Sequence, residues 1–423
     1  MKFEENINEI EYENFVSSHK KSHFMQSYYW GEVMKKKNFT PHYVGLKKKN
    51  KLVATALLLE KKLPKGYCYF YCPRGYIIDF NDLETLKIFT EELTKYAKKN
   101  KCIFIKIDPD IKRHDLDSEG NILGNDNNKL IEFLKNNGYK HKGFNIEFTN
   151  EQPRFTFRLD LTQSEEEILS NIHSTSRKIL NKGNQYGFSL YKGDVNDIND
   201  FYITMEETAE RENLGCNPIE YYKNFYEVLH KHNMSDLYVV KLNIKDLRKT
   251  YEDKIKDIDS RMDALNKNTK VNPKKQENRK KELETEKNRV NKDILELDKI
   301  DCDEVVLSSI MTAKYGDKVW TVHGGNITAL RYLNANYYLY YNIILDAKHE
   351  GYKQIDFFGC SGDANPDKSS SIYGLHNFKK RLGGEYHEFI GEFDLVTNKL
   401  MYFIFNTLIP IRRKLQKRKL RKR

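Results

Sequence analysis

The sequence predicts an α/β protein (α+β in its layout) built from two similar halves, with a helical hairpin inserted into the second half. Short apolar runs alternate with amphipathic segments in residues 1–155, and the same alternation returns in residues 156–243 and 301–384. Residues 244–300 break this pattern, because they are rich in charge and poor in apolar side chains. A chain of 423 residues is also too long for one ordinary core. The repeated pattern suggests an internal duplication.

The first half is expected to contain a β-hairpin, a strand, a helix and a further strand. Leu86, Phe89 and Leu93 recur at helical spacing, which predicts an amphipathic helix. The final strand must stop at Asp108–Pro109, because proline cannot donate a hydrogen bond to a sheet. The expected elements are the hairpin 42–63, a strand within 67–80 that ends at the Pro-Arg-Gly turn 73–75, the helix 83–99 and a strand within 102–111 that stops at Asp108–Pro109.

The second half repeats this arrangement of strands and helices. Gly187 is a plausible stop for the first helix, because glycine readily adopts the left-handed conformation that ends helices. The expected strands cover residues 157–161, 188–193, 236–242, 303–325 and 353–362, and the expected helices cover residues 164–187 and 337–351.

The segment 244–300 has apolar residues at every seventh position, which is the repeat of a coiled-coil seam. A polar stretch that contains Pro273 separates two such series. This predicts an antiparallel helical hairpin placed between two strands. Such an arm is either a spacer or a grip on a large anionic partner. The two series are Ile244, Tyr251, Ile258 and Leu265, then Leu283, Val290 and Leu297.

The sequence lacks the short motifs of the common nucleotide-binding, metal-dependent and nucleophilic enzymes. It contains no P-loop, no GxGxxG after a strand, no HExxH and no GxSxG. Its histidines do not have metal-ligand spacing, so we expect no metal and no covalent intermediate. An enzyme of this kind would transfer a group directly between two bound substrates, by orientation and electrostatics.

Eight segments together resemble the FemABX peptidoglycan aminoacyltransferases. Each segment is weak alone, but the ordered set with an inserted coiled coil is specific and runs from about residue 8 to 400. The segments are MQSYYWGEV (25–33), FYCPRGYIID (70–79), FIKIDPDI (104–111), QPRFTFRLDL (152–161), NPIEYY (217–222), KYGDKVWTVHGGN (314–326), IDFFGCSGD (355–363) and YGLHNFKKRLGGEYHEFIGEFD (373–394).

The resemblance implies two tandem GNAT-like acyltransferase domains. The first, 1–155, would be completed by a C-terminal strand near 385–400, and the second would comprise 156–243 and 301–384. The implied activity moves Gly, Ala or Ser from aminoacyl-tRNA, the co-substrate, to the stem-peptide amine of a precursor, without a cofactor. That precursor is lipid II or UDP-MurNAc-pentapeptide, and the protein is expected to be a monomer or dimer.

The resemblance also implies roles for individual residues. Phe378 and Lys379 match the Phe-Lys pair at the reacting centre, where the ammonium would stabilise an oxyanion; the alternative is a surface lysine. Asp108 matches the family's Asp-Pro position and is a candidate proton acceptor, or else only ends a strand. Tyr221 matches a tyrosine that contacts the acceptor.

Some positions depart from the family pattern. Met34 stands four residues after Trp30, where members often have a phosphate-binding lysine, so a neighbouring lysine would have to substitute. Asn217 stands where some members have arginine, and His323 stands at a tyrosine position. The expected substrate-binding set is Trp30, Lys35, Lys36, Asn217, Tyr221 and His323.

The C-terminal segment 401–423 is apolar at first and then strongly basic. The last thirteen residues hold nine Lys or Arg and no acid, so removing them lowers the net charge from +11 to +2. Such a segment suits an anionic membrane surface. A docked terminal helix with a solvated tip, or contact with tRNA phosphates, are the alternatives.

The N-terminus is acidic and has no apolar core, and no run of 18 apolar residues occurs, so we expect a cytoplasmic protein, either free or peripheral at the inner leaflet. The six cysteines are expected to be buried, reduced thiols rather than zinc ligands or disulfides. Two other functions stay open: a catalytically inactive, membrane-associated scaffold and a tRNA-binding protein.

Overall fold

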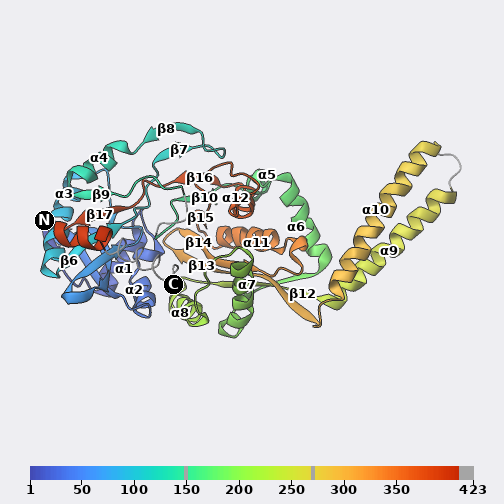
Figure 1. Cartoon of the computed structure of the whole chain (residues 1–423), viewed down its shortest axis with the longest axis horizontal. Helices are drawn as coiled ribbons and strands as arrows, with labels where there is room; N and C mark the ends of the chain where they lie inside the picture. The colour runs from blue at the N-terminus through green and yellow to red at the C-terminus, as the bar shows by residue number, and fades with distance from the viewer. Residues whose placement is uncertain (147–150, 268–271, 409–423) are drawn as a thin grey trace, which may run out of the picture.

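The structure of the protein is a computed structural model that describes residues 1–146, 151–267 and 272–408 (Figure 1). The basic segment 411–423 lies outside the described residues. Two mixed sheets lie side by side, and a long two-helix arm projects from one of them. The predicted α/β fold with two similar sheets and an inserted helical hairpin is confirmed.

The first sheet is built from the N-terminal part of the chain and one strand from the C-terminal part. Its order is β1-β2-β3-β4-β6-β17-β9, with β5 paired to β3. β17 lies between β6 and β9 and runs antiparallel to both. The strands are β1 (Lys2–Glu4), β2 (Thr40–Lys48), β3 (Lys51–Lys62), β4 (Cys68–Cys72), β5 (Ile77–Ile78), β6 (Cys102–Ile107), β9 (Tyr139–His141) and β17 (Phe393–Val396).

The second sheet has the order β11-β12-β13-β14-β15-β10-β16. A separate small hairpin, β7 with β8, follows β6 in the chain. The strands are β7 (His114–Leu116), β8 (Ile122–Asp126), β10 (Phe155–Asp160), β11 (Phe188–Gly193), β12 (Leu237–Asn243), β13 (Glu304–Tyr315), β14 (Lys318–Asn326), β15 (Gln354–Gly359) and β16 (Glu385–Glu388).

The two sheets have the same plan, which supports the duplication. Each has one parallel pair, β4 with β6 and β14 with β15, and a helix lies between the paired strands in the chain. In each sheet an antiparallel strand follows the parallel pair, β17 in the first and β10 in the second. The predicted C-terminal segment 385–400 is therefore divided, because β16 joins the second sheet and β17 the first.

Helices cover the faces of both sheets. The α-helices are α1 (Glu9–Ser18), α2 (Tyr28–Lys35), α3 (Leu83–Lys99), α4 (Asn128–Asn136), α5 (Glu165–Asn171), α6 (Ser174–Tyr186), α7 (Ile198–Arg211), α8 (Ile219–His230), α9 (Ile244–Lys267), α10 (Pro273–Leu297), α11 (Ala335–His349), α12 (Tyr373–Lys380) and α13 (Lys399–Phe403). The 3₁₀ turns are η1 (Phe24–Gln26), η2 (Pro64–Gly66), η3 (Val195–Asp197) and η4 (Arg331–Leu333), and the π-helix η5 (Ile404–Leu408) continues α13.

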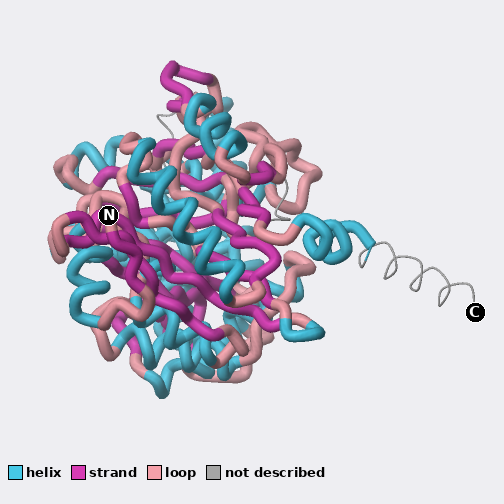
Figure 2. Tube along the Cα trace, turned by 90° about the vertical axis from the view of Figure 1, so that its left-hand side faces the viewer, coloured by secondary structure: helices cyan, strands magenta, loops and turns pink. Residues whose placement is uncertain are grey.

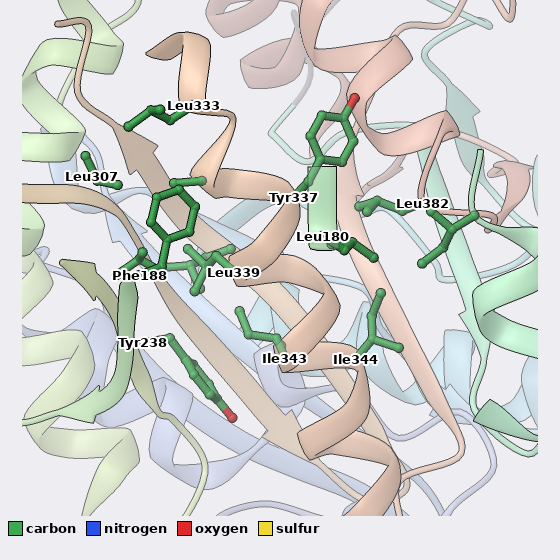
Figure 3. Packing of buried hydrophobic residues seen from close by; sticks show 14 of the residues in the cluster. Leu180, Phe188, Tyr238, Leu307, Leu333, Tyr337, Leu339, Ile343, Ile344 and Leu382 are labelled. Atoms are coloured by element: carbon green, nitrogen blue, oxygen red, sulfur yellow. The ribbon is translucent and has the colours of Figure 1, made fainter. Parts of the chain in front are cut away.

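The core of the second sheet packs around α11, as Figure 3 shows. Leu339 and Ile343 of α11 belong to one buried cluster with Phe188 of β11 and Leu307 of β13. Each fully buried side chain of this size contributes about 1.5–3 kcal/mol relative to an exposed one. The core thus holds α11 against the sheet whose strand ends carry the candidate site.

A second buried cluster joins the two halves. Phe24 and Trp30, which lie between β1 and β2 in the chain, pack against Trp320 and Phe225 of the second half. Removing so much apolar surface from water at the junction holds the halves together as one body.

The arm consists of α9 and α10, which pack antiparallel between β12 and β13. Its buried residues follow the predicted repeat of seven at Ile244, Tyr251 and Ile258, and again in α10 at Leu283, Val290 and Leu297. Leu247 is also buried, because the arm enters the main core at its base.

Two expectations from the sequence need correction. The single helix over 164–187 is broken into α5 and α6, because the His173 backbone N–H bonds to the Arg381 carbonyl and its ring begins a new helix. Of the six free cysteines, Cys302 is exposed and Cys216 is half-buried, since both lie in loops; the other four are buried. No helix among the described residues combines the length and the apolar character needed to cross a membrane.

Candidate active site

Lys379 lies in the last turn of α12, with its side chain directed into the protein. Only 6% of the residue is exposed, and Nζ donates a hydrogen bond to the Gly359 carbonyl at 2.7 Å. Burial lowers the pKa of Lys379 to about 8, because an ammonium group is less stable away from water. Within the described chain, no carboxylate lies within ion-pair distance of this ammonium. It is a buried cation with N–H donors to spare.

Phe378 sets the position of α12. Its ring lies edge-on to the rings of Tyr337 and Tyr340 on α11, with centroids 4.8 Å apart in each case. Aromatic rings favour this geometry because the edge of one faces the π-cloud of the other. Phe378 therefore fixes the turn from which Lys379 extends.

The carbonyl that Lys379 bonds to follows a strained residue. Phe358 has φ +61°, a left-handed conformation that bulky residues rarely adopt and that costs about 1–3 kcal/mol. Two side chains hold it there. Asp356 accepts a hydrogen bond from the Phe358 N–H at 2.7 Å, and the Thr156 hydroxyl donates to the Phe358 carbonyl at 3.0 Å. This clamp aims the Gly359 carbonyl at the lysine.

Arg158 connects the clamp to the first sheet. Its Nε donates to Asp356 at 2.7 Å, and its two terminal nitrogens donate to Asp110 at 3.0 and 2.7 Å. Burial alone would raise the pKa of Asp110, but the Arg158 guanidinium holds it well below its usual range. The loop after β6 and the end of β15 are thus joined by a buried ion pair.

Asp108 precedes that loop and is buried. One carboxylate oxygen accepts from the Tyr71 hydroxyl at 2.8 Å and the other from the Arg74 N–H at 2.6 Å. Burial raises the pKa of Asp108 to about 6, although Arg74 opposes the change. Among the described residues, no hydrogen bond or ion pair joins Asp108 to Lys379.

A second group of predicted residues meets at the end of β14. The Tyr221 hydroxyl lies 3.2 Å from His323 Nε2. Burial, with a smaller effect of Lys37, lowers the pKa of His323 to about 3, so the ring is neutral at physiological pH. Lys37 Nζ donates to Asn217 Oδ1 at 3.2 Å and lies 4.1 Å from the centre of the Tyr221 ring.

Lys37, rather than the expected Lys35 or Lys36, is the lysine that contacts Asn217 and Tyr221. Lys35 is in the last turn of α2 and bonds to Glu32 at 2.6 Å, and Lys36 is the exposed cap of that helix. Because the chain leaves the helix there, the next lysine turns toward Asn217. The sequence shows three consecutive lysines, but which of them reaches Asn217 depends on the residue at which α2 ends.

Lys37 lies beside a basic cavity of about 590 Å³. Lys61 donates to the Lys37 carbonyl at 3.3 Å, and burial together with Lys61 lowers the pKa of Lys37. Within the described residues, neither ammonium has a carboxylate within ion-pair distance. The cavity is lined by Lys35, Asn38, Phe39, Thr40, Pro41, Lys61 and Lys62.

Trp30 does not belong to this surface. Its ring is 5% exposed and packs edge-on against Phe24 and more distantly against Phe225. Its position therefore supports packing rather than the expected substrate contact.

The structure arranges these residues as two groups, one near the end of β15 and one near the end of β14. β14 and β15 pair only over Lys318–Trp320 with Gln354–Asp356, so the strand ends that carry His323 and Gly359 are not bonded to each other. Each group holds a lysine, Lys379 or Lys37, that has no carboxylate within ion-pair distance in the described part of the chain. The described residues contain no cluster of three or more His, Cys, Asp or Glu side chains suited to a metal ion.

Comparison with known proteins places this arrangement in a family. The chain is 27% identical over 413 residues to the lipid II:glycine glycyltransferase of Staphylococcus aureus (strain USA300), covering 96% of this chain and 95% of that protein. It is 29% identical over 418 residues to the enzyme of the same name from Staphylococcus haemolyticus (strain JCSC1435), with the same coverage.

Among solved structures, the crystal structure of FemX aligns with a TM-score of 0.75 at 25% identity, covering 96% of this chain and 99% of that one. The model of the FemAB family matches residues 7–409, which is nearly the whole chain. The resemblance noted from the ordered motifs is confirmed, and the chain belongs to the FemAB family.

Proposed function

We propose that this acyltransferase moves glycine from glycyl-tRNA to the stem-peptide amine of lipid II, in the synthesis of peptidoglycan cross-bridges. The similarity to lipid II:glycine glycyltransferases over 96% of the chain supports the acceptor and the choice of glycine among the three small amino acids. The observation that carries the proposal is the buried ammonium of Lys379, which among the described residues has no carboxylate within ion-pair distance.

The proposed chemistry needs a positive group at one place. The acceptor amine attacks the carbonyl carbon of the aminoacyl ester, and negative charge develops on the carbonyl oxygen. A C–N bond forms, the C–O bond to the tRNA ribose breaks, and the amine proton ends on the released ribose oxygen. Lys379 is held by Gly359 with N–H donors left over, which suits it to bind that oxyanion.

The acceptor is proposed to bind at the basic cavity beside Lys37. Lipid II carries a diphosphate, and Lys35, Lys61 and Lys62 line a cavity large enough for such a group, with Lys37 beside it. Asn217, in place of an arginine, holds Lys37 instead of contacting phosphate itself. Lys37 then supplies the positive charge that other family members place at the positions of Met34 and Asn217.

The donor is proposed to approach from α12. A cavity of about 450 Å³ lies at the end of that helix, and His173, Asn377 and Arg381 are among its lining residues. A basic and hydrogen-bonding hollow one turn from Lys379 suits the phosphate and base at the 3′ end of a tRNA.

The tail 411–423 is proposed to bring the enzyme to the cytoplasmic face of an anionic membrane, where lipid II is held. Nine basic residues in thirteen support this, because each gains electrostatic attraction near anionic headgroups.

The test uses purified full-length protein, lipid II in detergent micelles and tRNA charged with glycine, alanine or serine. Mass spectrometry of the lipid II product should show glycine added from glycyl-tRNA. Lys379→Met should remove most turnover, whereas Lys368→Met, an exposed lysine before α12, should not. Absence of transfer from every charged tRNA would overturn the proposal in favour of a scaffold or a tRNA-binding protein.

A further inference from the structure

The C-terminal helix, α13 continued by η5, covers one face of β6. Tyr402 is buried and donates to Asp394 at 2.7 Å. The rings of Phe104 and Tyr69 are stacked 5.3 Å apart, and the Phe405 ring lies within 5.9 Å of both. One side of the helix is therefore firmly packed, and its position on the first sheet is set.

The other side of this helix exposes large apolar side chains. Leu400 is 70% exposed and Phe403 is 53% exposed, and they lie three residues apart on one helical face. Figure 2 shows this last helical segment leaving the body of the molecule. Two large apolar groups on the outer face of a protruding helix are disfavoured in water and suit a partner that is itself apolar.

Lysines lie beside this helix, at its start and next to its packed side. Lys399 is exposed next to Leu400, and Lys140 and Lys142 lie 5.4 and 5.9 Å from the centre of the Tyr402 ring. Lys62 and Lys65 are exposed on either side of Leu63, which packs against the same small cluster. Glu151 lies close to Tyr69 and adds a negative charge to this region.

The same surface adjoins the basic cavity. Lys61 and Lys62 line that cavity, and the next residue, Leu63, packs beneath the C-terminal helix. A flat anionic partner that met the helix would also lie at the mouth of the cavity proposed for the diphosphate of lipid II.

We infer that this surface is a membrane-docking face, composed of Lys62, Lys65, Lys140, Lys399, Leu400 and Phe403, that lies on an anionic phospholipid bilayer. Leu400 and Phe403 enter the headgroup region, and the lysines meet lipid phosphates. A nucleic acid would satisfy the lysines but not the two exposed apolar side chains. The inference extends the proposed function, because it presents the acceptor cavity to the membrane that contains lipid II.

Flotation with lipid vesicles tests the face directly. Wild-type protein should float with vesicles of phosphatidylglycerol and phosphatidylcholine but not with pure phosphatidylcholine. The double variant Leu400→Gln, Phe403→Gln, which keeps the whole basic tail, should bind at least about tenfold more weakly. Leu295→Gln, in the arm, removes a leucine that is 61% exposed and should bind as wild type.

Unchanged vesicle binding by a folded double variant would overturn the inference, with folding checked by its thermal unfolding midpoint. Loss of tRNA binding in the double variant, with vesicle binding intact, would instead identify a nucleic-acid surface and would also overturn it.

Activity separates this inference from the proposed function. The double variant should lose about tenfold in rate with lipid II in anionic vesicles but keep its rate with lipid II in nonionic micelles, where docking is not needed. Equal loss in both would show damage to the active site and contradict the docking role. A wild type that binds vesicles through this face but transfers nothing to either acceptor would refute the proposed function alone.

Discussion

Lys379 combines a buried ammonium with a pKa near the physiological range, so its charge should control the rate. The protonated form stabilises an oxyanion, and burial lowers the pKa to about 8. Turnover should therefore fall as pH rises through about 8. Lys379→Met should lower turnover at least about tenfold, or about 1.4 kcal/mol in barrier, and should abolish that alkaline limb.

The measurement is the pH dependence of kcat with saturating substrates, because kcat reports groups in the bound complex. Lys368→Met serves as the control and should keep the alkaline limb. An alkaline limb that persists in the Lys379→Met variant would assign the titration to another group, such as the acceptor amine.

Asp108 is predicted to control the acidic side of the same profile. If it accepts the amine proton, turnover should rise with pH through about 6, the pKa to which burial raises it. Asp108→Asn should then lower kcat about 100-fold and remove the acidic limb. A slower variant with the acidic limb unchanged would mean that Asp108 only holds Tyr71 and Arg74 in place.

Lys37 should act on acceptor binding rather than on the chemical step. Its ammonium contacts Asn217 and the Tyr221 ring beside the basic cavity, whereas the ammonium of Lys379 bonds to the Gly359 carbonyl. Lys37→Met should raise KM for lipid II about tenfold with little change in kcat, which is the signature of lost uniform binding. Lys36→Met, at the exposed neighbour, should change neither value by more than about twofold.

At the scale of elements, the base of the arm anchors the arm in the core of the second half. Leu297, fully buried, belongs to the main core of the second half, whereas Leu295 on the same helix is 61% exposed. Leu297→Ala should lower the free energy of unfolding by about 2–5 kcal/mol, because it leaves a cavity. Leu295→Ala should cost no more than about 0.5 kcal/mol. Urea unfolding followed by circular dichroism measures both, and equal effects would contradict this view of the arm.

The sequence predicts best those elements whose pattern of apolar residues arises from contacts with neighbours nearby in the chain. The seams of α9 and α10 and the strand that ends at Asp108–Pro109 depend on neighbours along the chain. The break between α5 and α6 depends on a hydrogen bond from His173 to Arg381, two hundred residues away, so no local pattern contains it.

The candidate site was predictable only in part for a related reason. Lys379 and Tyr221 were identified through the family motifs, and the structure buries the first and pairs the second with His323. The clamp of Asp356 and Thr156 on Phe358 and the contact of Lys37 with Asn217 arise where separate elements meet. Such contacts have no signature in a single sequence.

At the scale of the whole molecule, Arg158 is the buried cation that joins the two sheets. Replacing it by methionine leaves Asp110 and Asp356 buried without their partner, and breaking such a pair costs about 3–5 kcal/mol. Because Asp110 has a folded pKa well below its unfolded value of about 3.9, its stabilisation is present above that pH and is lost as pH falls toward the folded pKa.

The difference in free energy of unfolding between wild type and Arg158→Met should therefore be full at pH 7 and shrink below about pH 4. Urea titrations at several pH values measure it. A difference that does not change with pH would mean that the variant loses packing, including the contact of Arg158 with the Phe389 ring, rather than the ion pair.

The position of β17 has a consequence for how the protein is made. This strand fills the space between β6 and β9, so residue 396 pairs with residue 104 across almost three hundred positions of chain. A ribosome has synthesised all of the second half, including the arm, before the strand that completes the first sheet emerges. Until then β6 and β9 present unpaired edges, which are the sites where nascent chains aggregate or recruit chaperones. The N-terminal half is therefore the first part to be translated and the last to be finished.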